Sequence, residues 1–253
     1  GPSFASGCAA LRRLDLTRSP KLARVQSGFA GRSGVSELAL PAVCPALTDW
    51  EDGPLASCPQ VQSWAAPRTP KLLRVPSSLL RGCSRLSRVD TSGLHGVREV
   101  GDQCFSTCPS LTSIDLAGLA NVTSIGANFA SENSSLTALD TSCLTALTSV
   151  GPRFCSGCVA MHTLDARGLV RIAAEPLFFF GDCRSLRAID TGGIANAGAV
   201  DALLRLLDSS ATPPRVADRE KTTRNGSQTQ PVAPAATGRV VGAGQYVLHL
   251  GPA

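Results

Sequence analysis

The sequence predicts an α/β repeat solenoid, a stack of about eight 25-residue turns with a parallel β-sheet on its concave face and a helical cap at the C-terminal end. Three observations support this fold class. One short pattern recurs along most of the chain, several residue columns keep its spacing, and glycine or proline interrupts segments that might otherwise be helical. A unit this short buries its apolar side only against neighbouring units, so the stack shares one continuous core.

The repeat is anchored on the aspartate of the pattern L-x-x-[IVL]-D. Asp15 lies 75 residues before the first regular anchor, and two weaker copies, anchored near Ala39 and Ala65, fill that gap. The regular anchors follow one another at intervals of 25 residues and are Asp90, Asp115, Asp140, Asp165 and Asp190. The chain therefore carries eight copies, with one interval of 24 residues and one of 26.

Three further columns keep the same period. Ten residues after the anchor lie Val25, Val75, Val100, Ile125, Val150 and Val200, with Trp50 one register late. Fourteen residues after it lie Phe29, Leu79, Cys104, Phe129, Phe154, Phe179 and Leu204. Seven residues before it lie Cys8, Cys58, Cys83, Cys108, Asn133, Cys158 and Cys183. Agreement among so many columns indicates one structural unit repeated along the chain.

An α-solenoid is the alternative, because apolar residues at 111, 114, 119, 122, 125 and 129 can be placed on one helix face. Glycine at 93, 118, 168 and 193 argues against it, since glycine costs about 1 kcal/mol inside a helix and proline about 3 kcal/mol. Helix-pair repeats also need about 33 residues or more. Each copy is better explained by a short strand, a turn at the glycine column, a second extended stretch and a compact turn.

The pattern C-x-x-L-x-x-[IL]-D-[LT]-x-x-L-x-x-[LV]-x-x-[IV]-G-x-x-F resembles leucine-rich repeats of the BspA-like type. The resemblance covers roughly residues 4 to 208 and departs from the pattern in the second and third copies, where "TDWEDGPLASC" replaces the regular turn. It implies a leucine-rich-repeat solenoid of a family found in bacterial and protist proteins, often at cell surfaces. Such repeats serve many unrelated partners, so the resemblance specifies a fold rather than an activity.

The composition is that of a globular chain, with 43% hydrophobic and 17% charged residues among 253. No run of eighteen apolar residues predicts a transmembrane segment, and no signal peptide is recognisable. Because the repeat is already under way at Phe4, we expect a fragment that lacks its natural N-terminus. Residues 1–98 carry 13 Lys+Arg against 6 Asp+Glu, whereas residues 99–197 carry 5 against 9, so the two halves differ in charge.

The ten cysteines allow two interpretations. Oxidised, the column could bridge adjacent turns, but residues of one column point the same way, and Cys8 has no neighbour in it. We therefore expect buried, reduced thiols that close each turn, with Asn133 bonding to the backbone in the same column. "CSGC" (155–158) has a redox or half-zinc spacing but no second pair accompanies it, so we predict no metal site and no cofactor.

The aspartate column is the first candidate binding site. Asp90, Asp115, Asp140, Asp165 and Asp190 should project from the concave face about 5 Å apart. In the first interpretation each carboxylate accepts N–H groups of the following turn. In the second, the column binds a cationic partner segment or divalent ions, and the two can coexist.

The second candidate is a basic flank, formed by "RSPKLARV" (18–25) and "RTPKLLRV" (68–75). Its residues are Arg18, Lys21, Arg24, Arg68, Lys71 and Arg74, which should align near Arg98. They either solvate the surface or dock an acidic protein, RNA or anionic lipid. A nucleic-acid partner is disfavoured because the chain has one tyrosine and its phenylalanines fall largely in core columns. Trp50 and Trp64 are interpreted as packing residues.

Three regions are predicted. Residues 1–210 form the solenoid, closed by an amphipathic helix at "GAVDALLRLLDSS" (198–210). Residues 211–237 have the composition of a disordered linker, and 238–253 contain a strand that can add to a sheet edge.

No nucleophile–base set or phosphate loop is recognisable, so we do not expect an enzyme. The sequence favours a non-catalytic leucine-rich-repeat scaffold that binds protein through its concave face or basic flank. The alternatives are an adhesin-like module at the cell surface or secreted, and a structural subunit of a larger assembly. Because many free thiols suit a reducing compartment, we expect an intracellular, cytoplasmic protein.

Overall fold

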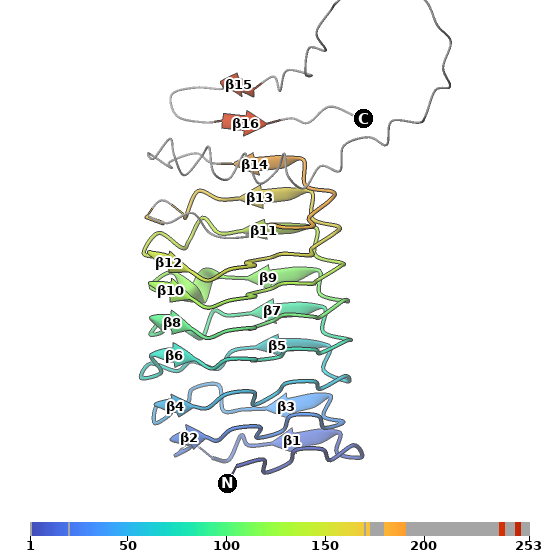
Figure 1. Cartoon of the computed structure of the whole chain (residues 1–253). Coiled ribbons are helices and arrows are strands. Elements are labelled where there is room, and N and C mark those ends of the chain that lie inside the picture. Colours follow the sequence, from blue (N-terminus) through green and yellow to red (C-terminus); the bar gives the residue numbers. More distant parts are fainter. Residues whose placement is uncertain are drawn as a thin grey trace, which may run out of the picture.

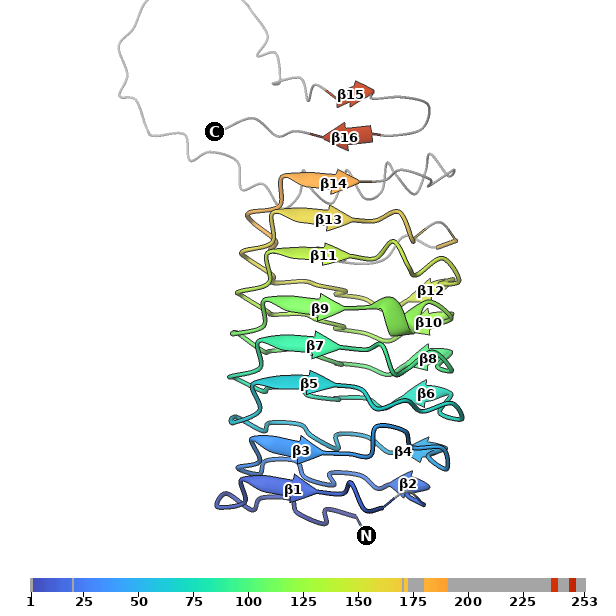
Figure 2. The same cartoon turned by 180° about the vertical axis from the view of Figure 1, so that it is seen from behind.

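The computed structural model describes residues 2–19, 21–169, 171–172 and 180–190, and the backbone of 238–240 and 246–248. In this part the chain winds into a stack of turns, and each regular turn contributes two short strands. Figures 1 and 2 show these strands as two columns that rise together from the N-terminal end.

The first column contains the strand that ends at each anchor. Its central residue is directed inward and is buried in most turns, while its neighbours are more exposed, as the alternation of side chains along a strand requires. Neighbouring strands are parallel and keep register, so that Leu14 faces Leu38 and Leu164 faces Ile189. The strands are β1 (Arg13–Asp15), β3 (Glu37–Ala39), β5 (Ser63–Ala65), β7 (Arg88–Asp90), β9 (Ser113–Asp115), β11 (Ala138–Asp140), β13 (Thr163–Asp165) and β14 (Ala188–Asp190).

These eight strands bound seven complete turns, so the parallel repeat stack is confirmed, including the two weak copies anchored at Ala39 and Ala65. The single continuous sheet that we expected is wrong. Hydrogen bonds divide the first column into β1–β3, β5–β7–β9 and β11–β13–β14.

The second column consists of two-residue strands. They are β2 (Arg24–Val25), β4 (Asp49–Trp50), β6 (Arg74–Val75), β8 (Glu99–Val100), β10 (Ser124–Ile125) and β12 (Ser149–Val150). Trp50 faces Val25 directly, so its assignment to this column, one residue late after its anchor, is confirmed. The extra residue of this irregular copy lies before Trp50, in the loop that follows Ala39.

The helical part of the α/β class is not found in the described residues. Their one helical segment is a short 3₁₀ helix, η1 (Ala117–Leu119), and the rest of the stack consists of strands and turns. Glycine and proline in the repeat account for this, because they oppose helix propagation. The predicted capping helix at 198–210 and the linker at 211–237 lie outside the described residues.

The segment 238–253, for which one strand is predicted, contains two. Strands β15 (Gly238–Val240) and β16 (Tyr246–Leu248) pair antiparallel, and β16 is also antiparallel to β14, with Val247 opposite Asp190. The division of the chain into three regions stays a prediction.

The core runs the length of the stack as a file of aromatic rings. Phe129 and Phe154 are fully buried, with ring centroids 5.3 Å apart and nearly parallel planes, and Phe105 meets Phe129 edge-on at 5.7 Å. The file continues to Trp64 and Trp50 at one end and to Phe180 at the other. Phe179, the predicted member of this column, lies outside the described residues.

The corner that joins the second column to the next turn has an unusual backbone. Gln103, Phe105 and Thr107 all have positive φ, between 56° and 59°, and the pattern recurs at 128, 130 and 132. Left-handed residues cost roughly 1–2 kcal/mol each in an L-chain. Hydrogen bonds between turns offset this cost: Gln103 N–H donates to Ala127 O (2.7 Å) and Phe105 N–H to Leu79 O (2.9 Å).

The cysteine column closes this corner from inside. From Cys58 onward, each member of the column donates a hydrogen bond to the carbonyl of the residue 28 positions earlier, which lies in the preceding turn. The bonds are Cys58 Sγ to Ala30 O (3.1 Å), Cys83 Sγ to Leu55 O (3.3 Å), Cys108 Sγ to Leu80 O (3.1 Å), Asn133 Nδ2 to Phe105 O (2.9 Å), Cys158 Sγ to Ala130 O (3.2 Å) and Cys183 Sγ to Cys155 O (3.1 Å). We call this series the corner ladder.

Replacing Phe129 by alanine should lower the free energy of unfolding by about 3–5 kcal/mol, because it removes a ring packed on both sides and leaves a cavity. Urea denaturation followed by circular dichroism measures the loss. Thr145→Ala, at an exposed position of the next copy, is the matched control and should change stability by about 0.5 kcal/mol or less. A Phe129→Ala protein as stable as this control would contradict the packing described.

Candidate functional site

The five predicted aspartates form a row along the C-terminal ends of the first-column strands. We call Asp90, Asp115, Asp140, Asp165 and Asp190 the aspartate row. Asp90 faces Asp115 across β7 and β9, and Asp140, Asp165 and Asp190 face one another across β11, β13 and β14. The structure therefore brings these carboxylates together as the repeat spacing predicts.

Four carboxylates of the row accept the backbone N–H two residues further on. The donors are Ser92 N to Asp90 (2.8 Å), Ala117 N to Asp115 (2.9 Å), Ser142 N to Asp140 (2.8 Å) and Arg167 N to Asp165 (3.0 Å). Hydrogen bonds from Ser92 hold the pKa of Asp90 below its ordinary value. These hydrogen bonds fix the direction of the aspartate side chains, and this structural role is compatible with a binding role of the row.

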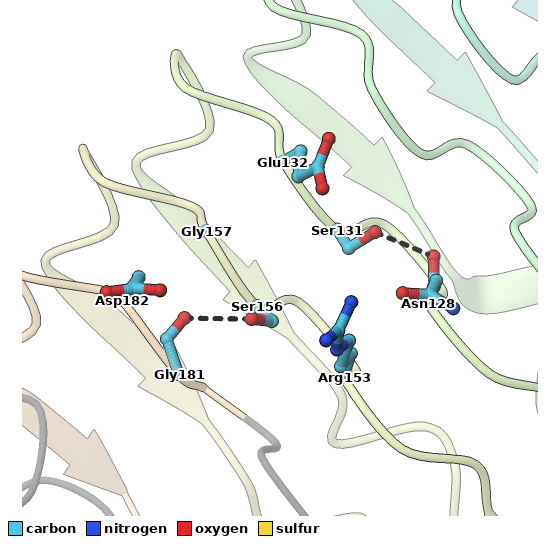
Figure 3. A pocket seen from close by; sticks show the side chains of 8 residues that line it. All are labelled: Asn128, Ser131, Glu132, Arg153, Ser156, Gly157, Gly181 and Asp182. Carbon is cyan, nitrogen blue, oxygen red and sulfur yellow. Dashed lines mark hydrogen bonds between the residues drawn. The ribbon is translucent and has the colours of Figure 1, made fainter.

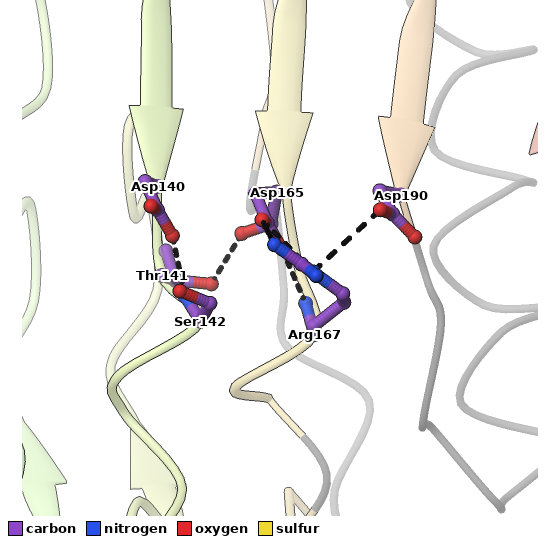
Figure 4. A network of polar contacts seen from close by, with 6 residues as sticks. All are labelled: Asp140, Thr141, Ser142, Asp165, Arg167 and Asp190. Carbon is purple, nitrogen blue, oxygen red and sulfur yellow. Dashed lines mark hydrogen bonds and ion pairs between the residues drawn. The ribbon is translucent and has the colours of Figure 1, made fainter.

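Arg167 neutralises the C-terminal end of the row (Figure 4). Its guanidinium donates to both oxygens of Asp165 through Nε, at 2.9 Å each, and through Nη2, and Nε lies 3.6 Å from Asp190 Oδ2. The hydrogen bond from Arg167 lowers the pKa of Asp165. Our sequence reasoning did not single out Arg167, although its position two residues after an anchor was the available signal.

The basic flank is exposed but is not one continuous patch. All six of its side chains are exposed. Strand β4 lies between β2, which carries Arg24, and β6, which carries Arg74, and Arg24 Nε lies 3.6 Å from Asp49 Oδ2. The two basic triplets are therefore two turns apart. A cavity of about 340 Å³ between them is lined by acidic Asp49, Glu51 and Asp52 as well as by Arg74.

A polar hollow lies on the corner near the C-terminal end of the described stack (Figure 3). It has a volume of about 360 Å³ and is lined by Asn128, Ser131, Glu132, Arg153, Ser156, Gly157, Gly181 and Asp182. Two of its hydroxyl groups are already bonded, Ser131 Oγ to Asn128 O (3.1 Å) and Ser156 Oγ to Gly181 O (3.0 Å). Within the described residues no His, Cys, Asp or Glu group has the arrangement of a metal site.

All ten cysteines are free thiols, and eight of them are buried. Burial raises the pKa of Cys104 to about 12 and that of Cys108 to about 11. Both thiols are therefore protonated at neutral pH, which is the form in which Cys108 donates its bond of the corner ladder, while Cys104, outside that column, donates to Pro76 O (3.0 Å). Cys155 and Cys158 of "CSGC" are both buried and engage the backbone of neighbouring turns rather than each other.

Comparison with known proteins places this geometry in a family. The model of the BspA type leucine rich repeat region, with six copies, matches residues 28–190. The chain belongs to this family. A leucine-rich repeat protein from Bacteroides ovatus has a similar crystal structure, with a TM-score of 0.54 and 18% sequence identity. The match covers 73% of this chain and 44% of that one, and at this identity it shows the fold alone.

No curated protein matches the chain significantly. Family membership establishes a BspA-type repeat scaffold of a generally non-catalytic class, without assigning a binding site. Within the residues that the structure describes, no helix is long and apolar enough to cross a membrane.

The burial of the thiols generates a reactivity prediction for this BspA-type protein. In the native protein at pH 8, exposed Cys8 should react rapidly with an alkylating reagent, and half-buried Cys143 should react more slowly. The eight buried thiols should react only when the stack opens. Mass spectrometry of alkylated peptides over time distinguishes the three groups, with urea-unfolded protein as the control; rapid native labelling of Cys104 or Cys108 would contradict this account.

Proposed function

We propose that this BspA-type repeat protein is a non-catalytic scaffold that binds a cationic segment of a partner protein along the aspartate row. The observation that supports this site is the register of the row, which repeats one carboxylate per strand over a rigid parallel stack. Parallel strands are spaced about 4.8 Å apart, so the negative charges follow one another at a regular, short interval.

The N-terminal part of the row has the most binding capacity. Asp90, Asp115 and Asp140 each use Oδ1 for the turn N–H, whereas Asp165 is bound on both oxygens by Arg167. Arg167 neutralises Asp165 and Asp190, as a partner's arginine would do further along the row. Lysine or arginine side chains of a partner can supply the missing charge-assisted bonds.

The basic flank supports a second candidate, the docking of an acidic protein partner. Its six exposed cationic side chains carry this alternative, although Asp49 divides them and neutralises part of the charge. RNA and anionic lipid remain weaker options, because the exposed surface offers few aromatic side chains for stacking. A role as structural subunit of a larger assembly is compatible with either surface.

We further propose that the protein works in a reducing, intracellular compartment, the cytoplasm in the first instance. The support is chemical, since the corner ladder uses protonated thiols as donors and a disulfide would remove them. A cell-surface or secreted, adhesin-like module is the alternative, and the redox state of the cysteines in the native source separates the two.

Replacing Asp90, Asp115 and Asp140 together by asparagine tests the proposed site. Asparagine retains an oxygen for the turn N–H but removes three charges, so the fold should persist while affinity for a cationic probe falls at least about tenfold. Fluorescence anisotropy with a labelled hexalysine peptide at low salt measures the affinity, and quantitative capture of native partners measures the same loss for proteins.

The matched control replaces Lys21 and Lys71 of the basic flank by glutamine. This variant should bind hexalysine at least as well as the native protein but should lose affinity for hexaglutamate. Unchanged hexalysine affinity and partner capture in the triple asparagine variant would rule out the aspartate row. Loss of partner capture in the Lys21→Gln/Lys71→Gln variant alone would favour the basic flank.

A further inference from the structure

A groove divides the first column between β3 and β5. It has a volume of about 330 Å³ and is lined mainly by apolar residues, among them Leu38, Leu40, Pro41, Val61 and Trp64. This volume lies in the range of protein ligand sites. We call it the split groove; Figures 1 and 2 show the wide interval between β3 and β5 at its position.

Both strands that border the split groove have an unpaired edge there. Where neighbouring strands pair, the end of one strand bonds to the next turn, as in Leu16 N to Ala39 O (2.7 Å) and Ala66 N to Asp90 O (2.9 Å). The other break in the first column, between β9 and β11, also lacks this bond, but those two strands lie closer together than β3 and β5 do. Leu40 and Ala65 form no such bond with each other, and β3 and β5 belong to separate sheets. Exposed strand edges are ready to pair with another extended chain.

The side chains behind the split groove explain why the turns separate. Trp50 and Trp64 occupy core positions that hold valine, isoleucine or leucine in the regular copies, and their rings lie 6.2 Å apart. The loop after Ala39 also carries an extra residue and Pro41, which has no N–H for a ladder bond. Two large rings and an irregular loop thus hold β3 away from β5.

Trp64 supplies a second and independent sign of a ligand. Its side chain lines the split groove and is 6% exposed, yet its buried Nε1 has no hydrogen-bond partner. Nε1 of Trp50 also lacks a partner, but the Trp50 side chain does not line the groove. An unpaired buried donor typically costs about 1–3 kcal/mol. A carbonyl oxygen brought into the groove by a peptide can accept this hydrogen bond and remove the cost.

One end of the split groove is closed by an isolated parallel bridge. Val43 and Arg68 form it, with Cys44 N bonded to Arg68 O (2.8 Å) and Arg68 N to Ala42 O (3.0 Å). An extended chain that enters from the open end must stop at this bridge. Arg68 directly follows Pro67, which lines the groove, and its side chain is exposed, so it is the cation next to the closed end that suits a terminal carboxylate.

We propose that the split groove binds the C-terminal tail of a partner protein as an added strand. The tail runs parallel to β3 and β5, carries small or β-branched apolar side chains, and places its terminal carboxylate at Arg68. The groove lining runs from Ser36 to Ala42, so at about 3.3 Å per residue it is long enough for a five-residue tail. The inference does not depend on the aspartate row, since the two surfaces share no residue.

The test uses the full chain and the pentapeptide acetyl-TVTVV with a free C-terminal carboxylate. Isothermal calorimetry should show saturable one-to-one binding, and intrinsic fluorescence should change because Trp64, one of the two tryptophans of the chain, lines the groove and the other, Trp50, packs against Trp64. The same peptide with an amidated C-terminus should bind at least about fivefold more weakly, because it lacks the carboxylate. Proline at the central position should abolish binding, because it removes a strand N–H and restricts the backbone.

Three variants locate the site. Arg68→Gln should bind the free acid and the amide equally, whereas Arg18→Gln, an exposed arginine of the same basic half, should retain the native preference. Trp64→Phe keeps an aromatic ring but removes the N–H, so it should weaken every peptide about three- to tenfold. Circular dichroism checks that each variant is folded.

Absence of saturable binding to folded native protein at peptide concentrations up to about 1 mM would overturn the proposal. Equal affinity for the proline peptide would also overturn it, because binding would then not involve strand pairing. An acid preference that survives in Arg68→Gln would overturn the placement of the carboxylate. None of these outcomes alters the hexalysine test of the aspartate row, so the two proposals fail separately.

Discussion

The rest of the stack depends on a hydrogen bond between a side chain inside the corner and a carbonyl of the preceding turn. The corner backbone reverses through left-handed residues, and four of the six residues whose carbonyls the ladder satisfies, Leu80, Phe105, Ala130 and Cys155, have positive φ. Buried carbonyls without partners destabilise a fold. A small donor at the end of the next corner is therefore required, and cysteine or asparagine meets the requirement without disturbing the packed rings beside it.

Because this hydrogen bond is repeated once per turn, a constraint on each corner acts along the whole stack. It keeps the corners in register, and the strands of the first column therefore stay in register as well. This alignment places Asp140, Asp165 and Asp190 opposite one another. The second turn departs from this plan. There Ser33 donates to Ala30 O within its own turn, the following loop is longer, and two tryptophans fill the core. The separation of β3 from β5, and with it the split groove, follows from these changes.

Much of this architecture could be predicted from the residues, because a column repeated over several copies averages out local ambiguity. The anchors, the rings of Phe129 and Phe154 and the Asn133 substitution in the cysteine column follow from spacing. Phe105 and Phe180, which continue the file of rings, stand one residue after the predicted column. The corner geometry could not be predicted, since Ser78, Gln103, Asn128 and Arg153 share a left-handed position without sharing chemistry. The split groove was also missed, because the effect of Trp50 and Trp64 depends on how two irregular copies meet in space. Arg167 was missed because it has no counterpart in the other copies.

The most direct test of this account compares Asn133→Ala with Asn133→Cys. Native Asn133 donates to Phe105 O and Ala130 O and accepts from Cys108 N. Cysteine restores the donor to Phe105 O that other turns use, whereas alanine leaves Phe105 O and the Cys108 N–H unpaired, at about 1–3 kcal/mol for each buried group. Ala130 O keeps its bond from Cys158 Sγ in both variants. Urea unfolding together with hydrogen exchange at the Cys108 amide should show a clearly larger loss for alanine than for cysteine. Equal stability of the two variants would contradict the claim that corner donors hold the turns together.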